Sequence, residues 1–177
     1  SVSDLLAAGV SVSDLLAAGV SVSDLLAAGV SVSELLAAGV SVSDLFDAGV
    51  GVGTLEINGA DSTALANAGL IGSVNDVDGN SYKWIKIGNQ IWMAENLNLY
   101  TPTGSWYNNN DSASYSSVYG RLYDWATVMN GETSSLSNPS GVQGICPAGW
   151  HLPSDAEWTE LSDYLIANGY GYGGSGD

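Results

Sequence analysis

The sequence predicts an α+β protein in two parts: decapeptide repeats over residues 1–70, then a mixed domain over residues 71–177. Three observations support this. The stretch SVSDLLAAGV occurs three times in succession and is followed by two near copies. After Gly72 apolar and polar residues alternate, as in half-buried strands. Further on, two stretches place apolar residues at helical spacing.

Each ten-residue repeat contains signals that begin and end a short helix. Ser1 suits an N-cap, and Asp4 stands where its carboxylate completes a capping box. Gly9 stands where a helix end needs a left-handed residue. The apolar face would hold Val2, Leu5 and Leu6. These signals favour an α-solenoid of short helices, each of which is stable only when it stacks on its neighbours.

A β-solenoid is the alternative for the same letters. The repeat resembles a pentapeptide pattern in which residues such as Leu5 and Val10 point inward. The strict ten-residue period argues against it, whereas the sixth repeat, GVGTLEINGA, contains glycines and β-branched residues that suit a helix poorly. We count seven repeats over residues 1–70, the last two degenerate, as terminal repeats often are.

Two roles fit such an array. It can be a passive spacer, or it can self-associate into fibres through identical side chains at a fixed pitch. We favour the spacer, because specific lateral pairing needs more than a repeated surface. The exposure of Leu6 bears on the choice.

The composition argues against several partners. The chain has 19 acidic residues and three basic ones, Lys83, Lys86 and Arg121, for a net charge of −16. Nucleic-acid phosphates are bound by clustered Lys and Arg, so we expect no nucleic-acid partner. No apolar run approaches the ~20 residues of a membrane-spanning helix, and we expect no membrane insertion.

Residues 72–100 are predicted to form strands joined by hairpin turns at Asp78-Gly79-Asn80 and Gly88-Asn89. Asp76 and Asp78 invite a calcium interpretation. The spacing departs from an EF-hand loop, because Ile87 stands where that loop needs its last carboxylate. We therefore expect a solvated turn and no metal.

The rest of the chain is predicted to alternate loops and helices. Residues 101–120 should form a polar loop, and a helix should follow through Leu122, Trp125, Ala126 and Met129. A short strand near Ile145 and a Pro-Gly turn should precede a helix with Ser154 as N-cap and Glu157 at the capping-box position. The buried face of this last helix should hold Trp158, Leu161 and Leu165.

Three stretches of the second part follow the order of a known family: DGNSYKWIKIGNQIWMAENLNLY, WYNNNDSASYSSVYGRLYDWATVMN and NPSGVQGICPAGWHLPSDAEWTEL. They resemble the Fibrobacter succinogenes major paralogous domain over about residues 74–177. The resemblance implies a C-type-lectin-like fold related to formylglycine-generating enzymes, and an extracellular or cell-surface location. It also implies a partner cysteine for Cys146 and further strands, so we expect an incomplete domain.

We expect no enzymatic activity and no cofactor. Cys146 and His151 lie five residues apart, but a catalytic dyad needs a third, orienting group, so we expect structural roles for both. One His and one Cys also fall short of a zinc ligand set. The helix dipole explains the acidic residues Glu157, Glu160 and Asp163.

Ligand binding is expected in the polar segment instead, because aromatic rings stack on sugars while amides bond their hydroxyls. The candidate residues are Trp106, Tyr107, Asn108, Asn109 and Tyr115. We therefore expect an extracellular or cell-surface structural or adhesive protein, in which a repeat stalk or self-assembling fibre displays a lectin-like module. The alternative is a carbohydrate-binding module with the repeats as passive spacer.

Overall fold

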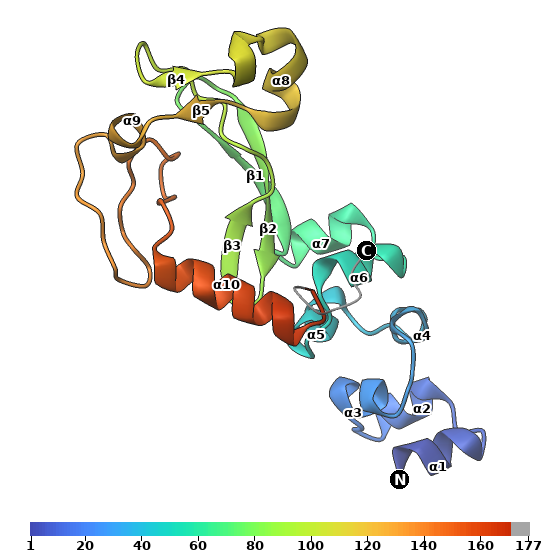
Figure 1. Cartoon of the computed structure of the whole chain (residues 1–177). Coiled ribbons are helices and arrows are strands. Elements are labelled where there is room, and N and C mark those ends of the chain that lie inside the picture. Colours follow the sequence, from blue (N-terminus) through green and yellow to red (C-terminus); the bar gives the residue numbers. More distant parts are fainter. Residues whose placement is uncertain (171–177) are drawn as a thin grey trace. The chain divides into compact units, whose positions relative to one another are not determined.

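The computed structural model describes residues 1–170. The chain divides into two compact units, Ser1–Ile71 and a second that begins at Gly72. We call the first the repeat segment and the second the module. Figure 1 shows short helices in the first and strands combined with helices in the second. The predicted α+β class is confirmed.

Seven six-residue helices make up the repeat segment. They are α1 Val2–Ala7, α2 Val12–Ala17, α3 Val22–Ala27, α4 Val32–Ala37, α5 Val42–Asp47, α6 Val52–Ile57 and α7 Ser62–Asn67. The helical interpretation is therefore confirmed and the β alternative is wrong. The glycines of the sixth repeat do not prevent a helix, because packing of α5 against α6 outweighs the low helix propensity of these residues.

Serine caps begin the first five helices. The Asp4 amide donates to Ser1 Oγ at 3.3 Å, and equivalent bonds recur in the next four repeats. The longer Glu34 carboxylate also reaches the Ser31 backbone N–H at 2.9 Å. Asp14 reaches only the Ser11 hydroxyl, at 2.7 Å. The capping box is thus complete in α1 and α4, and the other aspartates form part of it.

Each helix ends in the predicted left-handed glycine. Gly9 has φ = 86°, and the six corresponding glycines have φ between 67° and 99°. The Gly9 amide donates to the Leu6 carbonyl, and the Val10 amide donates to the Leu5 carbonyl. This is the Schellman arrangement, which satisfies carbonyls that the helix leaves open. The chain then enters the next N-cap directly.

The first leucine of each repeat forms the core of the segment. Leu15 is 2% exposed and Leu35 is 0% exposed, whereas Leu5 of the first repeat is 45% exposed. These leucines lie in repeats that differ at most in an Asp-to-Glu exchange, but they differ in whether a repeat precedes them. A preceding repeat therefore covers each inner leucine. The remaining fully buried members are Leu25, Leu45, Leu55 and Leu65.

The second leucine has a different environment. Leu6 is half-buried, and so are its equivalents Leu16, Leu26, Leu36 and Phe46. The predicted face that Leu5 and Leu6 share is therefore graded, with the first leucine of the pair inside and the second at the edge.

In the module, strands β1 Ile71–Asn75, β2 Ser81–Ile87 and β3 Gln90–Met93 form a sheet in the order β1-β2-β3. Strands β2 and β3 are antiparallel, with Ile87 opposite Gln90 and Trp84 opposite Met93. This register leaves Gly88 and Asn89 as a two-residue hairpin turn, and Gly88 has φ = 57°. The second predicted hairpin is confirmed in detail.

The predicted polar loop over residues 101–120 is wrong. It contains β4 Ser105–Trp106, the 3-10 helix η1 Asn108–Asn110 and helix α8 Ser112–Tyr119. Asp111 caps α8 by accepting from the Ser114 amide at 3.1 Å. A Ser-rich stretch with an Asp cap can therefore form a helix that hydrophobic periodicity does not reveal.

The next predicted helix begins later than expected. Leu122 lies in β5 Leu122–Tyr123, which pairs with β4, and α9 spans Trp125–Met129 after the N-cap Asp124. Residues near Ile145 form turns, so the predicted short strand there is wrong. Leu122 lies in a strand because β5 pairs with β4, and the local spacing of apolar residues cannot show such pairing.

Helix α10 Asp155–Ala167 has the predicted capping box at Ser154 and Glu157. Its predicted buried face is partly wrong. Trp158 is 53% exposed, with its ring 4.7 Å from that of Trp92 between centroids. Leu161 and Leu165 are half-buried, and Glu157 is the buried residue of the helix.

We predict that Leu35→Ala destabilises the repeat segment by about 2–5 kcal/mol, because it leaves a cavity between helices. Leu5→Ala is the matched control, and it should cost about 1 kcal/mol or less, since Leu5 already contacts solvent. Denaturant unfolding followed by far-ultraviolet circular dichroism measures both. Equal losses would contradict the packing described above.

Candidate functional site

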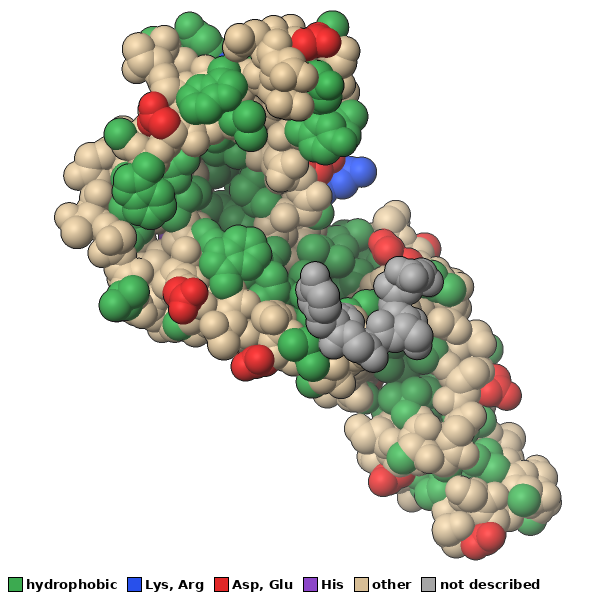
Figure 2. Space-filling view, viewed as in Figure 1, with side chains coloured by type: hydrophobic (Ala, Val, Ile, Leu, Met, Phe, Trp, Pro, Cys, Tyr) green, Lys and Arg blue, Asp and Glu red, His purple; other side chains and the backbone are tan. Residues whose placement is uncertain are grey.

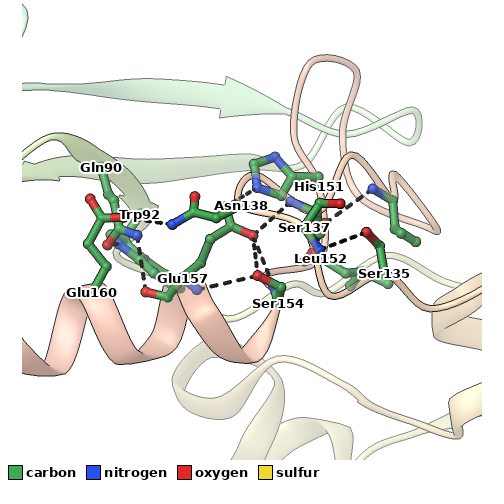
Figure 3. Close-up of polar contacts among 12 residues, drawn as sticks. Gln90, Trp92, Ser135, Ser137, Asn138, His151, Leu152, Ser154, Glu157 and Glu160 are labelled. Carbon is green, nitrogen blue, oxygen red and sulfur yellow. Dashed lines mark hydrogen bonds and ion pairs between the residues drawn. The ribbon is translucent and has the colours of Figure 1, made fainter.

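A buried glutamate, Glu157, links three parts of the module (Figure 3). Glu157 Oε2 accepts from the amides of Ser140 and Ser154 at 3.0 and 2.9 Å and from Ser154 Oγ at 3.2 Å. Its Oε1 lies 2.6 Å from His151 Nε2. The backbone carbonyl of Glu157 accepts from Gln90 Nε2 at 3.0 Å. Glu157 therefore joins α10 to the preceding loop and to β3.

The network keeps Glu157 ionised. Burial alone would raise the pKa of this carboxyl, but hydrogen bonds from Ser154, His151 and Ser140 outweigh burial and hold its pKa below the ordinary value. His151 is half-buried and is held by this carboxylate. The arrangement is that of a structural anchor, in which donors occupy both oxygens.

A second buried carboxylate organises the other end of the sheet. Asp76 accepts from the amides of Asp78 and Asn80 at 3.0 and 2.9 Å. It also accepts from Asn80 Nδ2 at 2.8 Å and from the Tyr82 hydroxyl at 2.6 Å. Burial opposes ionisation, yet these bonds lower the pKa of Asp76. The predicted turn is therefore built around Asp76, although this carboxylate is buried rather than solvated.

Cys146 has the environment of an unreactive thiol. It is half-buried, burial raises its pKa to about 11, and the charge of Glu132 adds to the shift. A thiol with such a pKa is a poor nucleophile at neutral pH. His151, the base that sequence spacing suggested for it, is bonded to Glu157. Within residues 1–170 no group of three or more His, Cys, Asp or Glu could hold a metal ion.

The predicted ligand-binding residues lie in consecutive elements. Trp106 ends β4 and is 42% exposed, and Asn108 and Asn109 in η1 are exposed. The Tyr107 ring packs against the Arg121 guanidinium, 4.1 Å from its centroid. Tyr115 in α8 is half-buried, and its ring lies 5.9 Å from that of Tyr119. Other side chains thus engage two of the three predicted rings, while Trp106 stays accessible.

A polar pocket of about 420 Å³, which the sequence did not reveal, lies beside α8. Its lining includes Asn80, Ser81, Glu95, Asn96, Asn98 and Ser116. Asn98 Oδ1 is buried there with no hydrogen-bond partner among the described residues. Two tyrosines hold the backbone at Asn98 and Leu99. The Tyr82 hydroxyl accepts from the Asn98 amide at 3.0 Å, and the Tyr123 hydroxyl donates to the Leu99 carbonyl at 2.8 Å.

A smaller hollow of about 150 Å³ lies beside α9. Trp125, Met129, Val142 and Leu152 line it together with serines and Asp155. The sequence placed Trp125 and Met129 on one apolar face, but Trp125 is 70% exposed and Met129 is 5% exposed. Residues Val142 and Leu152 come from a loop far along the chain, so no local pattern could have revealed this hollow.

Glu157→Gln should lower the stability of the module by about 2–3 kcal/mol at pH 7, because it weakens several hydrogen bonds to a buried charge. The folded-state pKa of Glu157 lies below the unfolded value of about 4.3. Its contribution is therefore complete above that unfolded value and is lost as the pH falls through the folded pKa. The gap between wild type and variant should close on acidification.

Asp163→Asn is the control for that variant, since Asp163 is an exposed carboxylate on the same helix. It should change stability by less than about 0.5 kcal/mol at any pH. Chemical unfolding at pH values from 7 to about 3 tests both variants. A difference for Glu157→Gln that stays constant over this range would contradict the role given to its charge.

Comparison with known proteins found a family match for the second half of the chain. Residues 85–175, more than half of the 177-residue chain, match the family described as Fibrobacter succinogenes major domain. No match was found among curated proteins or among solved structures. In the described part of the chain no helix is long and apolar enough to cross a bilayer. The predicted resemblance is confirmed, and the chain belongs to the Fibrobacter succinogenes major domain family.

Proposed function

We propose that this chain is a non-enzymatic extracellular or cell-surface protein, in which the repeats form a solenoid stalk and the second half is a lectin-like module that the stalk displays. The observation that carries the proposal is the burial of one leucine per repeat, from 45% exposed at Leu5 to 0–2% in the repeats that follow. A core made in this way can be lengthened by adding repeats, which suits a spacer.

The chemistry of the module also supports a non-catalytic role. Its buried carboxylates, Asp76 and Glu157, have their oxygens occupied by protein donors. Its thiol is held in the protonated form. Groups in this state stabilise a fold, whereas acid-base or nucleophilic chemistry needs an accessible group with a pKa near the working pH.

Electrostatics favours a stalk over a fibre. Residues 1–70 contain no Lys, Arg or His. The first five repeats each expose an acid at the same place: Asp4, Asp14, Asp24, Glu34 and Asp44. Two such segments side by side would bring like charges together, and the half-buried Leu6 row offers only modest apolar area in return. Monomeric stalks are therefore the expected state.

Deletion of residues 11–30 removes two whole repeats and keeps the ten-residue register of the remaining ones. We expect the variant to keep its helical content per repeat and an unchanged module, because each repeat contains both of its helix ends. If the repeats stack linearly, the maximum dimension falls by roughly 8–10 Å per repeat. Small-angle X-ray scattering measures this change.

The control for that deletion lacks residues 11–15 only. It joins half a repeat to a whole one, so helices near the junction should be lost. Full helicity in this control, or regular polymers of the wild-type chain by electron microscopy, would contradict the stalk proposal.

Carbohydrate binding by the module is the second candidate function. The exposed Trp106 and the amides of Asn108 and Asn109 favour it, as does the polar pocket beside α8. If these residues contact sugar, Trp106→Ala should weaken binding to a polysaccharide at least about tenfold, or 1.4 kcal/mol. Affinity electrophoresis with embedded polysaccharide tests this, and unchanged migration would remove Trp106 from the site.

A further inference from the structure

Trp125 has the greatest exposure, 70%, among the six tryptophans of the chain. Its place is fixed, because Asp124 caps α9 by accepting from the Thr127 amide at 2.8 Å. The same helix buries Met129 in the module. Figure 2 shows that large hydrophobic side chains also stand elsewhere on the module surface. Trp125 lines the hollow beside α9, whereas the other strongly exposed tryptophans, Trp106 and Trp158, line neither this hollow nor the pocket beside α8.

The hollow beside Trp125 has an apolar floor and a polar rim. Met129, Val142 and Leu152 supply the apolar surface, and Ser134 and Asp155 contribute a hydroxyl and a carboxylate. The side chains of Ser134 and Asp155 are both exposed. They are therefore available to a ligand. With a volume of about 150 Å³, the hollow is below the ~300 Å³ of sites for drug-sized molecules and suits a single ring.

Part of the wall is built in advance by the Glu157 network. Ser140 and Ser154 line the hollow, and both donate their amides to Glu157 (Figure 3 shows Ser154 and Glu157). The Ser140 hydroxyl also donates to the Leu152 carbonyl. These bonds fix the wall before any ligand arrives, which reduces the entropy cost of binding.

The lining selects among ligand classes by charge and polarity. No Lys or Arg from the described residues lines the hollow, and Asp155 adds a negative charge, so an anionic ligand would be repelled. An aliphatic peptide side chain would fill the floor but leave the serine and aspartate rim unmatched. A neutral sugar ring satisfies both parts, because its C–H face stacks on an indole while its hydroxyls donate to a carboxylate.

We propose that Trp125 and the adjoining hollow form a subsite for one neutral sugar ring of a glycan. This rests on the second candidate function, carbohydrate binding, and locates the contact at α9 rather than at Trp106 and Tyr107. Trp125 is the stacking platform, the Asp155 carboxylate accepts hydrogen bonds from sugar hydroxyls at the ring edge, and the Ser134 hydroxyl donates or accepts one there.

The test uses the full chain with a panel of methyl glycosides of glucose, mannose, galactose and xylose, N-acetylglucosamine, and N-acetyl-leucine amide as a peptide-like probe. Tryptophan fluorescence and saturation-transfer NMR report binding. We expect at least one sugar to bind, Trp125→Ala to weaken it at least about tenfold, and Asp155→Asn to weaken it several-fold. Trp158→Ala is the matched control and should stay within twofold of wild type, because Trp158 is exposed but does not line the hollow.

Near-ultraviolet circular dichroism and thermal unfolding verify that the variants are folded, which is expected because Trp125 is largely outside the core. Unchanged sugar binding by Trp125→Ala overturns the subsite. If Trp106→Ala abolishes binding and Trp125→Ala does not, carbohydrate binding stands and the subsite falls. Binding of N-acetyl-leucine amide alone overturns the sugar assignment, and binding of no probe overturns both. The stalk is tested separately by scattering.

Discussion

Burial of a single leucine side chain between successive helices is the interaction on which the first half of this protein depends. A helix of six residues is far too short to persist alone in water. N-caps, serines in the first five repeats, and Schellman ends fix where the helices begin and stop, but they leave one face of Leu35 and its equivalents open until another repeat covers it. Local signals thus define the repeat, and contact between repeats makes it stable.

The module is held together differently. Among the module residues that the structure describes, few large hydrophobic side chains are buried: Tyr82, Leu99, Met129 and Val142. Buried carboxylates complement them, because Asp76 gathers the turn between β1 and β2 while Glu157 joins a helix, a loop and a strand. Buried charges of this kind need complete sets of donors, so they fix local geometry closely. The Glu157 network also fixes Ser140 and Ser154, which form part of the wall of the hollow beside Trp125.

Features set by neighbours in sequence could be predicted. The caps at Ser1 and Ser154, the left-handed Gly9 and the hairpin at Gly88 all depend on residues a few positions apart. Helix α8 was missed because its Ser-rich sequence has no clear hydrophobic periodicity, and other errors concern partners that are distant in sequence. Leu122 forms a strand because Trp106 pairs with it. The sequence predicted the capping role of Glu157 but not its hydrogen bonds to Ser140 and His151. It also did not predict that Trp158 packs against the ring of Trp92 while remaining exposed. Family membership was evident from three separated motifs and is confirmed, whereas the role of Tyr107 and Tyr115 stays a prediction.

The self-contained ends of each helix have a genetic consequence. Because each of the first five repeats runs from its own serine cap to its own glycine, whole decapeptides can be gained or lost by duplication or deletion without shifting the helical phase of the remainder. A length change that is not a multiple of ten residues would instead place a cap inside a helix. The length of this segment can therefore change by whole repeats while the sequence of the attached domain stays the same.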